Sequence, residues 1–308
     1  MPYIVIGSPA LTKYMLKEHS NAKILSDGIL LDDNFQEEDV FSHEMLRIDA
    51  SSEIDYLSIT SAIAKKISKD ISFRICCTLH GSLQSNKSTI GYGSRDIEVN
   101  VGAALEKLGF KADLKDPKIV VNVHIIANVA YINISNKFQS DIRDDKINRA
   151  QSKIIEAFDF FKIDISTISP KTALDIGASP GGFSYILAKN NLHVDAIDSG
   201  EIDKRVLDLG VTHIKSKIEN FNTNKIYGII VNDMNISPID SMKLLLKFLP
   251  NLAGNGICIM TIKCVDKRSY FYYMRQMSSA LQLYAKNPIK FKHLPHNKTE
   301  LTMCFIKK

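Results

Sequence analysis

The sequence predicts an α/β protein whose C-terminal half is a mostly parallel sheet, preceded by two small α+β domains. Three observations lead to this prediction. Strand-like and helix-like segments alternate from about residue 147 to the end, an order that builds a parallel sheet with helices on both faces. A glycine-rich turn directly follows the first of these strands. The chain, with 308 residues, is also long enough for two or three domains.

Composition places the chain among folded proteins. Hydrophobic residues make up 45% and charged residues 24%, which excludes a wholly disordered, collagen-like or coiled-coil chain. We find no run of about 18 apolar residues that could span a membrane, and no signal peptide at the start. The five cysteines form no CxxC pair, so we expect free thiols and no metal site. A cytoplasmic protein that contacts no membrane is the expectation.

Charge is distributed unevenly along the chain. Residues 1–70 carry 7 basic and 12 acidic groups, a net charge of −5, whereas residues 71–146 carry +2 and residues 147–308 carry +8. The last segment is therefore the one suited to a polyanion such as RNA. Charge alone is also compatible with a mildly basic protein that binds no nucleic acid.

Two small α+β domains are expected before the parallel sheet, over residues 1–68 and 69–144. The first contains short apolar strands and ends with a helix over about residues 58–67. The second has the order strand–helix–strand–strand, in which an Ala127-Asn128 turn joins the last two strands. This order predicts a small sheet backed by a helix.

The glycine-rich turn is the strongest functional signal. It matches neither GxGxxG nor a phosphate-binding GK[ST] loop. Asp175 lies in the strand before the turn, and Asp198 ends the next strand, where an acid accepts hydrogen bonds from both ribose hydroxyls of a nucleoside. Carboxylates beside such a turn suit a positively charged nucleoside without phosphate, namely S-adenosylmethionine, although a turn that binds nothing is the alternative. The candidate cofactor-binding residues are Asp175, Gly177, Ala178, Ser179, Pro180, Gly181, Gly182, Phe183, Asp198 and Asp233.

The segment DIGASPGGFSYIL resembles the cofactor motif of the FtsJ-like ribose 2′-O-methyltransferases, D-x-G-A-x-P-G-G-[FW]. The resemblance covers about residues 147–308. It implies a Rossmann-like class I methyltransferase domain over residues 145–308, with a mostly parallel seven-stranded sheet. The family carries a Lys-Asp-Lys-Glu tetrad, and the residues that match it by type, order and setting are Lys153, Asp233, Lys263 and Glu300.

These residue types suit methyl transfer to a ribose hydroxyl. The 2′-hydroxyl is a weak nucleophile and must lose its proton as it attacks. We expect Lys263 to act as the base, because the neighbouring cation Lys153 helps it to shed its own proton. Asp233 orients the base, and Lys153 and Glu300 are positioning groups. The alternatives are ordinary surface ion pairs, or a histidine base at His293 or His296.

The segment from Ser94 to Ser135 resembles a THUMP domain, an RNA-binding module of tRNA- and rRNA-modifying enzymes. The combination resembles the RlmM-like rRNA 2′-O-methyltransferases, which implies RNA, either rRNA or tRNA, as the partner. Lys217 stands where many methyltransferases have an acid that contacts adenine, and Glu219 is its candidate replacement. The candidate RNA-binding residues are Arg74, Lys87, Arg95, Lys118, Lys267, Arg268, Lys290 and Lys292.

The function expected is therefore S-adenosylmethionine-dependent 2′-O-methylation of RNA ribose. An RNA base methyltransferase is the first alternative. Methylation of an amino group usually needs a [DN]-P-P-[YF] loop, whereas the sequence here reads Asp233-Met234-Asn235. Methylation of cytosine C5 needs a cysteine, for which Cys264 is the candidate. A non-catalytic THUMP protein with a decayed methyltransferase domain is the second alternative.

Overall fold

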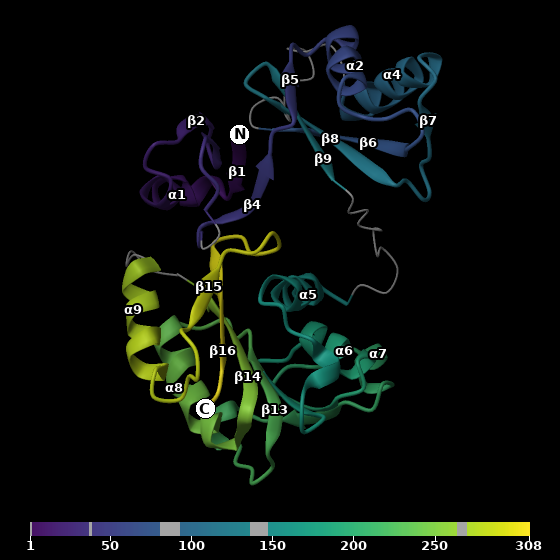
Figure 1. The fold of residues 1–308 in the computed structure, drawn as a ribbon. Coiled ribbons are helices and arrows are strands. Elements are labelled where there is room, and N and C mark those ends of the chain that lie inside the picture. The colour runs from purple at the N-terminus through teal and green to yellow at the C-terminus, as the bar shows by residue number, and fades with distance from the viewer. Residues whose placement is uncertain (1, 37–38, 81–92, 136–146, 264–269) are drawn as a thin grey trace. The chain divides into compact units, whose positions relative to one another are not determined.

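The structure, a computed structural model, describes residues 2–36, 39–80, 93–135, 147–263 and 270–308. The chain forms two compact units, residues 1–142 and residues 143–308 (Figure 1). Within the described ranges, no helix is both long and apolar enough to cross a membrane.

The N-terminal unit begins with a four-stranded antiparallel sheet in the order β2-β3-β1-β4. Pro9 starts a short 3-10 turn that leads into the helix, as expected of a residue whose φ is already helical. The elements are β1 (Tyr3–Gly7), η1 (Pro9–Leu11), α1 (Thr12–Glu18), β2 (Lys23–Ser26), β3 (Ile29–Asp32) and β4 (Ser42–Arg47).

A buried histidine stabilises the end of α1. The two ring nitrogens of His19 lie 2.7 Å from an Asp32 oxygen and 3.2 Å from an Asp39 oxygen. Burial disfavours the charged ring, but the hydrogen bonds to the two carboxylates raise the pKa of His19. The contacts join the helix to the sheet and to the segment that precedes β4.

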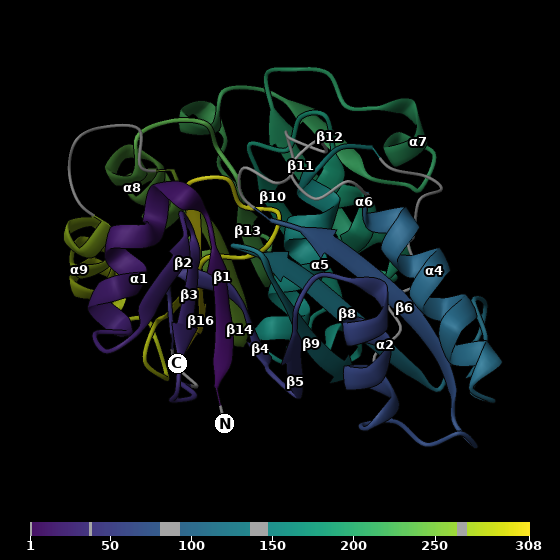
Figure 2. The same ribbon diagram turned by 90° about the horizontal axis from the view of Figure 1, so that it is seen from above.

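The second sheet of this unit has the order β5-β9-β8-β6-β7, with β6 parallel to both of its neighbours. Figure 2 shows α2 and α4 on one face of this sheet, and their side chains pack against each other. The elements are β5 (Ala50–Ser52), α2 (Tyr56–Ala64), β6 (Ser72–Leu79), α4 (Ser94–Lys107), β7 (Lys111–Ala112), β8 (Ile119–Ile126) and β9 (Val129–Ser135).

The helix expected over residues 58–67 lies in this second sheet's core, not in the first domain. Ile59 and Ile63 of α2 are fully buried in a cluster with Phe73 and Val101. The strand β5, which precedes α2, pairs with β9. The strand–helix–strand–strand order of the sequence is therefore correct, but the sheet takes up α2 and β5 as well.

The predicted turn between the last two strands is confirmed. Ala127 and Asn128 both have positive φ, 45° and 66°, as in the tight turns whose twist matches that of antiparallel strands. Strands β8 and β9 pair along their whole length on either side of it.

The C-terminal unit is built on a seven-stranded sheet with the order β12-β11-β10-β13-β14-β16-β15. Strands β10 to β14 all pair in parallel, whereas β16 runs antiparallel to β14, and β15 runs antiparallel to β16. The strands are β10 (Thr172–Ile176), β11 (His193–Asp198), β12 (Thr212–Lys215), β13 (Tyr227–Asn232), β14 (Leu252–Lys263), β15 (Lys290–Lys292) and β16 (Glu300–Ile306).

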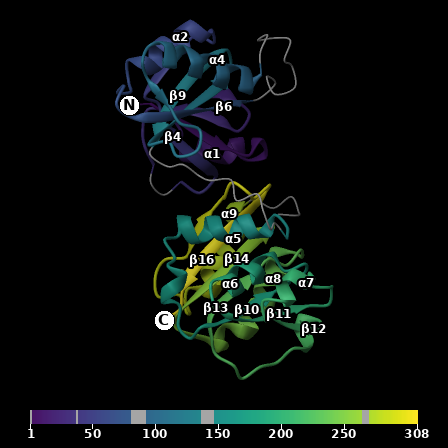
Figure 3. The same ribbon diagram turned by 90° about the vertical axis from the view of Figure 1, so that its right-hand side faces the viewer.

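Helices cover both faces of this sheet (Figures 1 and 3). Helices α5 and α6 pack together on one face, and α8 packs against α9 on the other. The helices are α5 (Ala150–Phe160), η3 (Ile165–Thr167), α6 (Gly182–Lys189), α7 (Lys204–Leu207), η4 (Ile218–Asn220), α8 (Pro238–Phe248), η5 (Leu249–Asn251) and α9 (Tyr270–Leu281).

The strand order places the site. The chain runs outward in one direction from β10 through β11 to β12, and then in the other direction from β13 to β14. Ligands in open α/β sheets bind outside the carboxyl ends of the strands where the order reverses. The carboxyl ends of β10, β11 and β13 therefore form the edge at which a site is expected.

Candidate functional site

The glycine-rich turn joins β10 to α6. Gly181 has φ +112°, and a Cβ there would lie 2.8 Å from a methyl of Val206, so only glycine fits without strain. Gly182 opens the helix, and a Cβ there would lie 2.0 Å from Asn148 Oδ1 and 3.0 Å from Ala150 Cβ. The missing side chain at Gly182 lets the first turn of α5 lie directly against α6.

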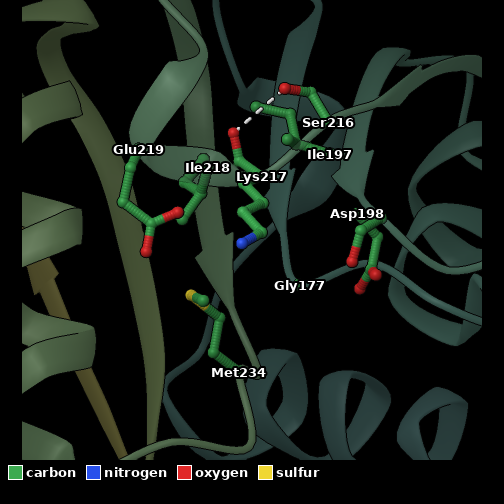
Figure 4. A pocket seen from close by; sticks show the side chains of 9 residues that line it. Gly177, Ile197, Asp198, Ser216, Lys217, Ile218, Glu219 and Met234 are labelled. Carbon is green, nitrogen blue, oxygen red and sulfur yellow. Dashed lines mark hydrogen bonds between the residues drawn. The ribbon is translucent and has the colours of Figure 1, made fainter.

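A cavity of about 260 Å³ opens at the carboxyl ends of β10 and β11 (Figure 4). Gly177 and Asp198 line it, together with Lys217, Glu219 and Met234. The Asp198 carboxylate accepts hydrogen bonds from the backbone N–H groups of residues 179 and 200, at 3.1 and 2.7 Å. These two bonds fix the carboxylate at the cavity wall.

The lining fits the adenosyl part of S-adenosylmethionine. Asp198 offers carboxylate oxygens to ribose hydroxyls, as expected of an acid at the end of the second strand. Ile218 and Met234 offer apolar surface to a purine ring, and Glu219 brings an acceptor for its amino group. Lys217 lines the cavity as well. The lysine at the position of the expected adenine-binding acid and its candidate replacement, Glu219, therefore both lie at this cavity.

Asp175 is buried beneath the turn and is not among the residues that line the cavity. It is 1% exposed, and it accepts a hydrogen bond of 2.7 Å from Ser184 of α6. Burial raises the pKa of Asp175 to about 7, against the effect of the Ser184 bond, and the charges of Asp233 and Asp198 raise it further. Asp175 therefore supports the turn from below.

Of the other candidate cofactor residues, Gly177 and Asp198 line the cavity, as described above. The remainder form the turn itself, the first residues of α6 or the end of β13. These are Ala178, Ser179, Pro180, Gly181, Gly182, Phe183 and Asp233.

The structure brings the four candidate catalytic side chains together. Lys153 Nζ, on α5, lies 3.0 Å from Glu300 Oε2 and 3.5 Å from Asp233 Oδ1. Lys263 Nζ, at the end of β14, lies 3.2 Å from the same Asp233 oxygen and donates a hydrogen bond of 2.8 Å to the Asp233 carbonyl. Four residues from four separate elements thus form one cluster.

Strand register explains part of this convergence. Lys263 ends β14 and Glu300 begins β16, and the two residues are direct partners in the antiparallel pair. Asp233 follows β13, which lies on the other side of β14. Met234, the residue after Asp233, lines the cavity, so the cluster adjoins the cavity.

Burial argues against ordinary surface ion pairs. The Lys153 side chain is 4% exposed, and the other three are between 13% and 16% exposed. Charges withdrawn from water to this degree are costly unless they are paired, as these are. The arrangement leaves two ammonium groups and two carboxylates at one edge of the sheet.

The histidines considered as alternative bases have other partners. Nδ1 of His296 is hydrogen-bonded to Glu156, whose second oxygen accepts the His296 backbone N–H at 3.0 Å. His293 is fully buried, and its Nε2 lies 3.3 Å from the Lys298 carbonyl. Cys264, the candidate nucleophile for base methylation, lies outside the described residues.

The candidate RNA-binding residues fall into three groups. Arg95, Lys118 and Lys290 are exposed, and Arg74 is half-buried with a hydrogen bond to the Leu114 carbonyl. Lys292 differs from the expectation, because it is 7% exposed and its Nζ lies 5.1 Å from the centre of the Phe160 ring. A cation held over an aromatic ring secures α5 to β15. Lys87, Lys267 and Arg268 lie outside the described residues.

The sequence did not predict the row of contacts that attaches α5 to the C-terminal strands. Lys153, Glu156 and Phe160 lie three and four residues apart, so they share one face of the helix. They contact Glu300, His296 and Lys292 respectively. The spacing of these three residues along one helix face is the sequence feature from which this row of contacts could have been predicted.

Comparison with known proteins identifies the two parts of the chain. Residues 58–135 match the THUMP domain, and residues 147–267 match the FtsJ-like methyltransferase family. The chain combines a THUMP domain with an FtsJ-like methyltransferase domain. Members of this methyltransferase family depend on S-adenosylmethionine, which agrees with the fit of the cavity.

Relatives extend this result. The chain is 32% identical over 167 residues to an uncharacterized protein of Methanocaldococcus jannaschii. This alignment covers 52% of this chain and 47% of the relative. It is 28% identical over 171 residues to ribosomal RNA large subunit methyltransferase M of a Marinomonas species, covering 52% and 48%. The chain thus spans about half the length of the curated relatives it matches. Among solved structures, TrmN from Thermus thermophilus aligns with a TM-score of 0.42 at 14% identity, over 100% of this chain and 99% of that one.

Proposed function

We propose that the protein methylates a ribose 2′-hydroxyl of RNA, with Lys263 as the base. The observation that carries this proposal is the cluster of Lys153, Asp233, Lys263 and Glu300 beside the cofactor cavity. S-adenosylmethionine supplies an electrophilic methyl group, and transfer to the hydroxyl oxygen leaves the sulfur as a thioether with the former C–S electron pair.

The contacts of Lys263 suit a base. A neutral amine has two N–H bonds and one lone pair, and two Asp233 oxygens lie within 3.2 Å of Nζ. If both N–H groups point to these oxygens, the lone pair is left to take the proton from the 2′-hydroxyl. Asp233 then stabilises the ammonium that forms. A fixed direction of the lone pair contributes alignment, which is a large part of such catalysis.

Lys153 acts on the same carboxylate from the other side. Its ammonium lies 3.5 Å from Asp233 Oδ1, so the same carboxylate oxygen is held between the two lysine side chains. Glu300 keeps Lys153 in place through the 3.0 Å contact. In this proposal Lys153 and Glu300 are positioning residues, Asp233 orients the base, and Lys263 meets the substrate.

RNA is the proposed substrate because the chain contains a THUMP domain and a methyltransferase domain with a net charge of +8 over residues 147–308. The relatives named as ribosomal RNA methyltransferases favour rRNA. The exposed Arg95 and Lys118 are proposed phosphate contacts. If so, Lys118→Ala in the full chain reduces the salt dependence of RNA binding by about one ion, whereas Lys23→Ala, an exposed lysine of the first sheet, leaves it unchanged.

The decisive experiment identifies the product. The full chain is incubated with rRNA, tRNA and a labelled methyl donor, and the RNA is then digested to nucleosides. We expect the label in 2′-O-methylnucleosides, and no label with Lys263→Met. Label in a methylated base would exclude the ribose assignment, and no label in any RNA that the protein binds would favour the non-catalytic alternative.

A further inference from the structure

Thr261 is a buried hydroxyl that contacts the cluster from below. It lies in β14 two residues before Lys263 and is 2% exposed. Its Oγ1 forms a short hydrogen bond to Asp233 Oδ1, and the Asn232 carbonyl lies farther away, at 3.3 Å. A hydroxyl has one hydrogen to donate, so the nearer carboxylate oxygen is the acceptor that takes it.

Three donors therefore converge on one oxygen atom. Asp233 Oδ1 receives the Thr261 hydroxyl and lies 3.2 Å from Lys263 Nζ and 3.5 Å from Lys153 Nζ. Within the described part of the chain, the side-chain hydrogen bonds and ion pairs of this carboxylate are all made by Oδ1.

The backbone around Asp233 is also held in place. Its N–H bonds to the Ile176 carbonyl at 3.3 Å, and the preceding Asn232 is fully buried. The Asn232 side chain accepts hydrogen bonds from the Met234 N–H at 3.1 Å and from Ser241 Oγ at 3.2 Å. The main chain is thus fixed on both sides of Asp233, and Thr261 is the neutral group that sets the rotation of its carboxylate.

We propose that Thr261 is a positioning residue, which turns the Asp233 carboxylate so that Oδ1 meets both lysines and the lone pair of Lys263 is left for the hydroxyl of the substrate. This inference rests on the proposed ribose methylation. The Thr261 hydroxyl also takes a share of the carboxylate's charge, because a hydrogen bond to an ionised oxygen is stronger than one to a neutral group. Without it, Asp233 attracts both ammonium groups more strongly.

The test compares Thr261→Val, which keeps the shape and removes the hydroxyl, with Thr261→Ser, which keeps the hydroxyl. Loss of a hydrogen bond to a charged group corresponds to a decrease in kcat of about 10- to 100-fold for the valine variant. We expect S-adenosylmethionine affinity to be unchanged, so that the loss is confined to kcat. Thr261→Ser should recover most of the rate.

A double-mutant cycle separates positioning from general stability. If Thr261 acts through Asp233, Thr261→Val has little further effect on single-turnover rates in an Asp233→Ala background, where the carboxylate that accepts its hydrogen bond is absent. Equal effects in both backgrounds, or a valine variant with the wild-type rate, would overturn the inference. Failure of the wild-type protein to form any 2′-O-methylnucleoside contradicts the proposed function instead, so the two failures are distinguishable.

Discussion

Replacing Asp175 with asparagine should make the C-terminal unit less sensitive to alkaline pH. The carboxyl is 1% exposed, and its pKa rises from 3.8 to about 7, mainly through burial. The folded protein therefore holds a proton that the unfolded chain releases between about pH 4 and pH 7. A group of this kind contributes stability that is complete below pH 3.8 and is lost as the pH rises through about 7.

The magnitude follows from the two pKa values. A separation of about three pH units corresponds to a change of about 4 kcal/mol in the free energy of unfolding. Asparagine has the same shape, still accepts the bond from Ser184, and does not ionise. We expect the ionisation of Asp175 to favour the variant over the wild-type protein by about 1 kcal/mol near pH 4.5 and by up to about 4 kcal/mol at pH 8.

Unfolding by urea, followed by circular dichroism at several pH values, measures this difference. The transition of residues 143–308 is recognised by its shift on addition of S-adenosylmethionine, because a ligand of the folded state stabilises it. Asp208→Asn, at an exposed aspartate of the same unit, is the matched control and should show a difference that does not change with pH. A difference between Asp175→Asn and wild type that is the same at pH 4.5 and pH 8 would refute the reasoning.

Substitutions at three positions test the site further. Lys263→Met and Lys263→Arg should both abolish methyl transfer in the nucleoside assay while cofactor affinity is retained. Methionine has no amine, and the guanidinium of arginine cannot accept a proton. Substantial turnover by the arginine variant would exclude a lysine base. Asp198→Ala should weaken S-adenosylmethionine binding by about 10- to 100-fold in calorimetry, and unchanged affinity would count against Asp198 as the ribose acceptor. Gly182→Ala should push α5 away from α6 and displace Lys153, so that kcat falls more than cofactor affinity does, and a loss confined to affinity would contradict this packing.

The parallel core was predicted from the alternation of strands and helices, and the tetrad from the resemblance to the FtsJ-like family; the strand order explains why part of the tetrad converges. The carboxyl ends of parallel strands meet at one edge of a sheet, so residues that end successive strands are brought together whatever their separation along the chain. Asp233 and Lys263 follow this rule directly. Glu300 follows a different one, because it begins an antiparallel strand whose first residue pairs with Lys263.

Other features depend on contacts that a local pattern does not contain. The apolar face of α2 shows that Ile59 and Ile63 are buried, but it does not say which sheet covers them. In the sequence, Lys292 is one of several cations in a basic stretch. Its position over the Phe160 ring is a contact between residues 132 positions apart, which the local sequence does not indicate. Thr261 is a small polar residue in an apolar strand, and its importance becomes visible only when β13 lies beside β14.

The two ends of α5 connect the cofactor turn to the tetrad. Its first turn packs against the turn at Gly182, where a side chain would not fit. Farther along, Glu156 and Phe160 attach the same helix to the C-terminal strands. Lys153 projects from between these two attachments and reaches Asp233. Because a helix transmits displacement along its length as a nearly rigid body, the position of Lys153 depends on both attachments, and Gly182 therefore influences the Lys153–Asp233 contact as well as the cofactor turn.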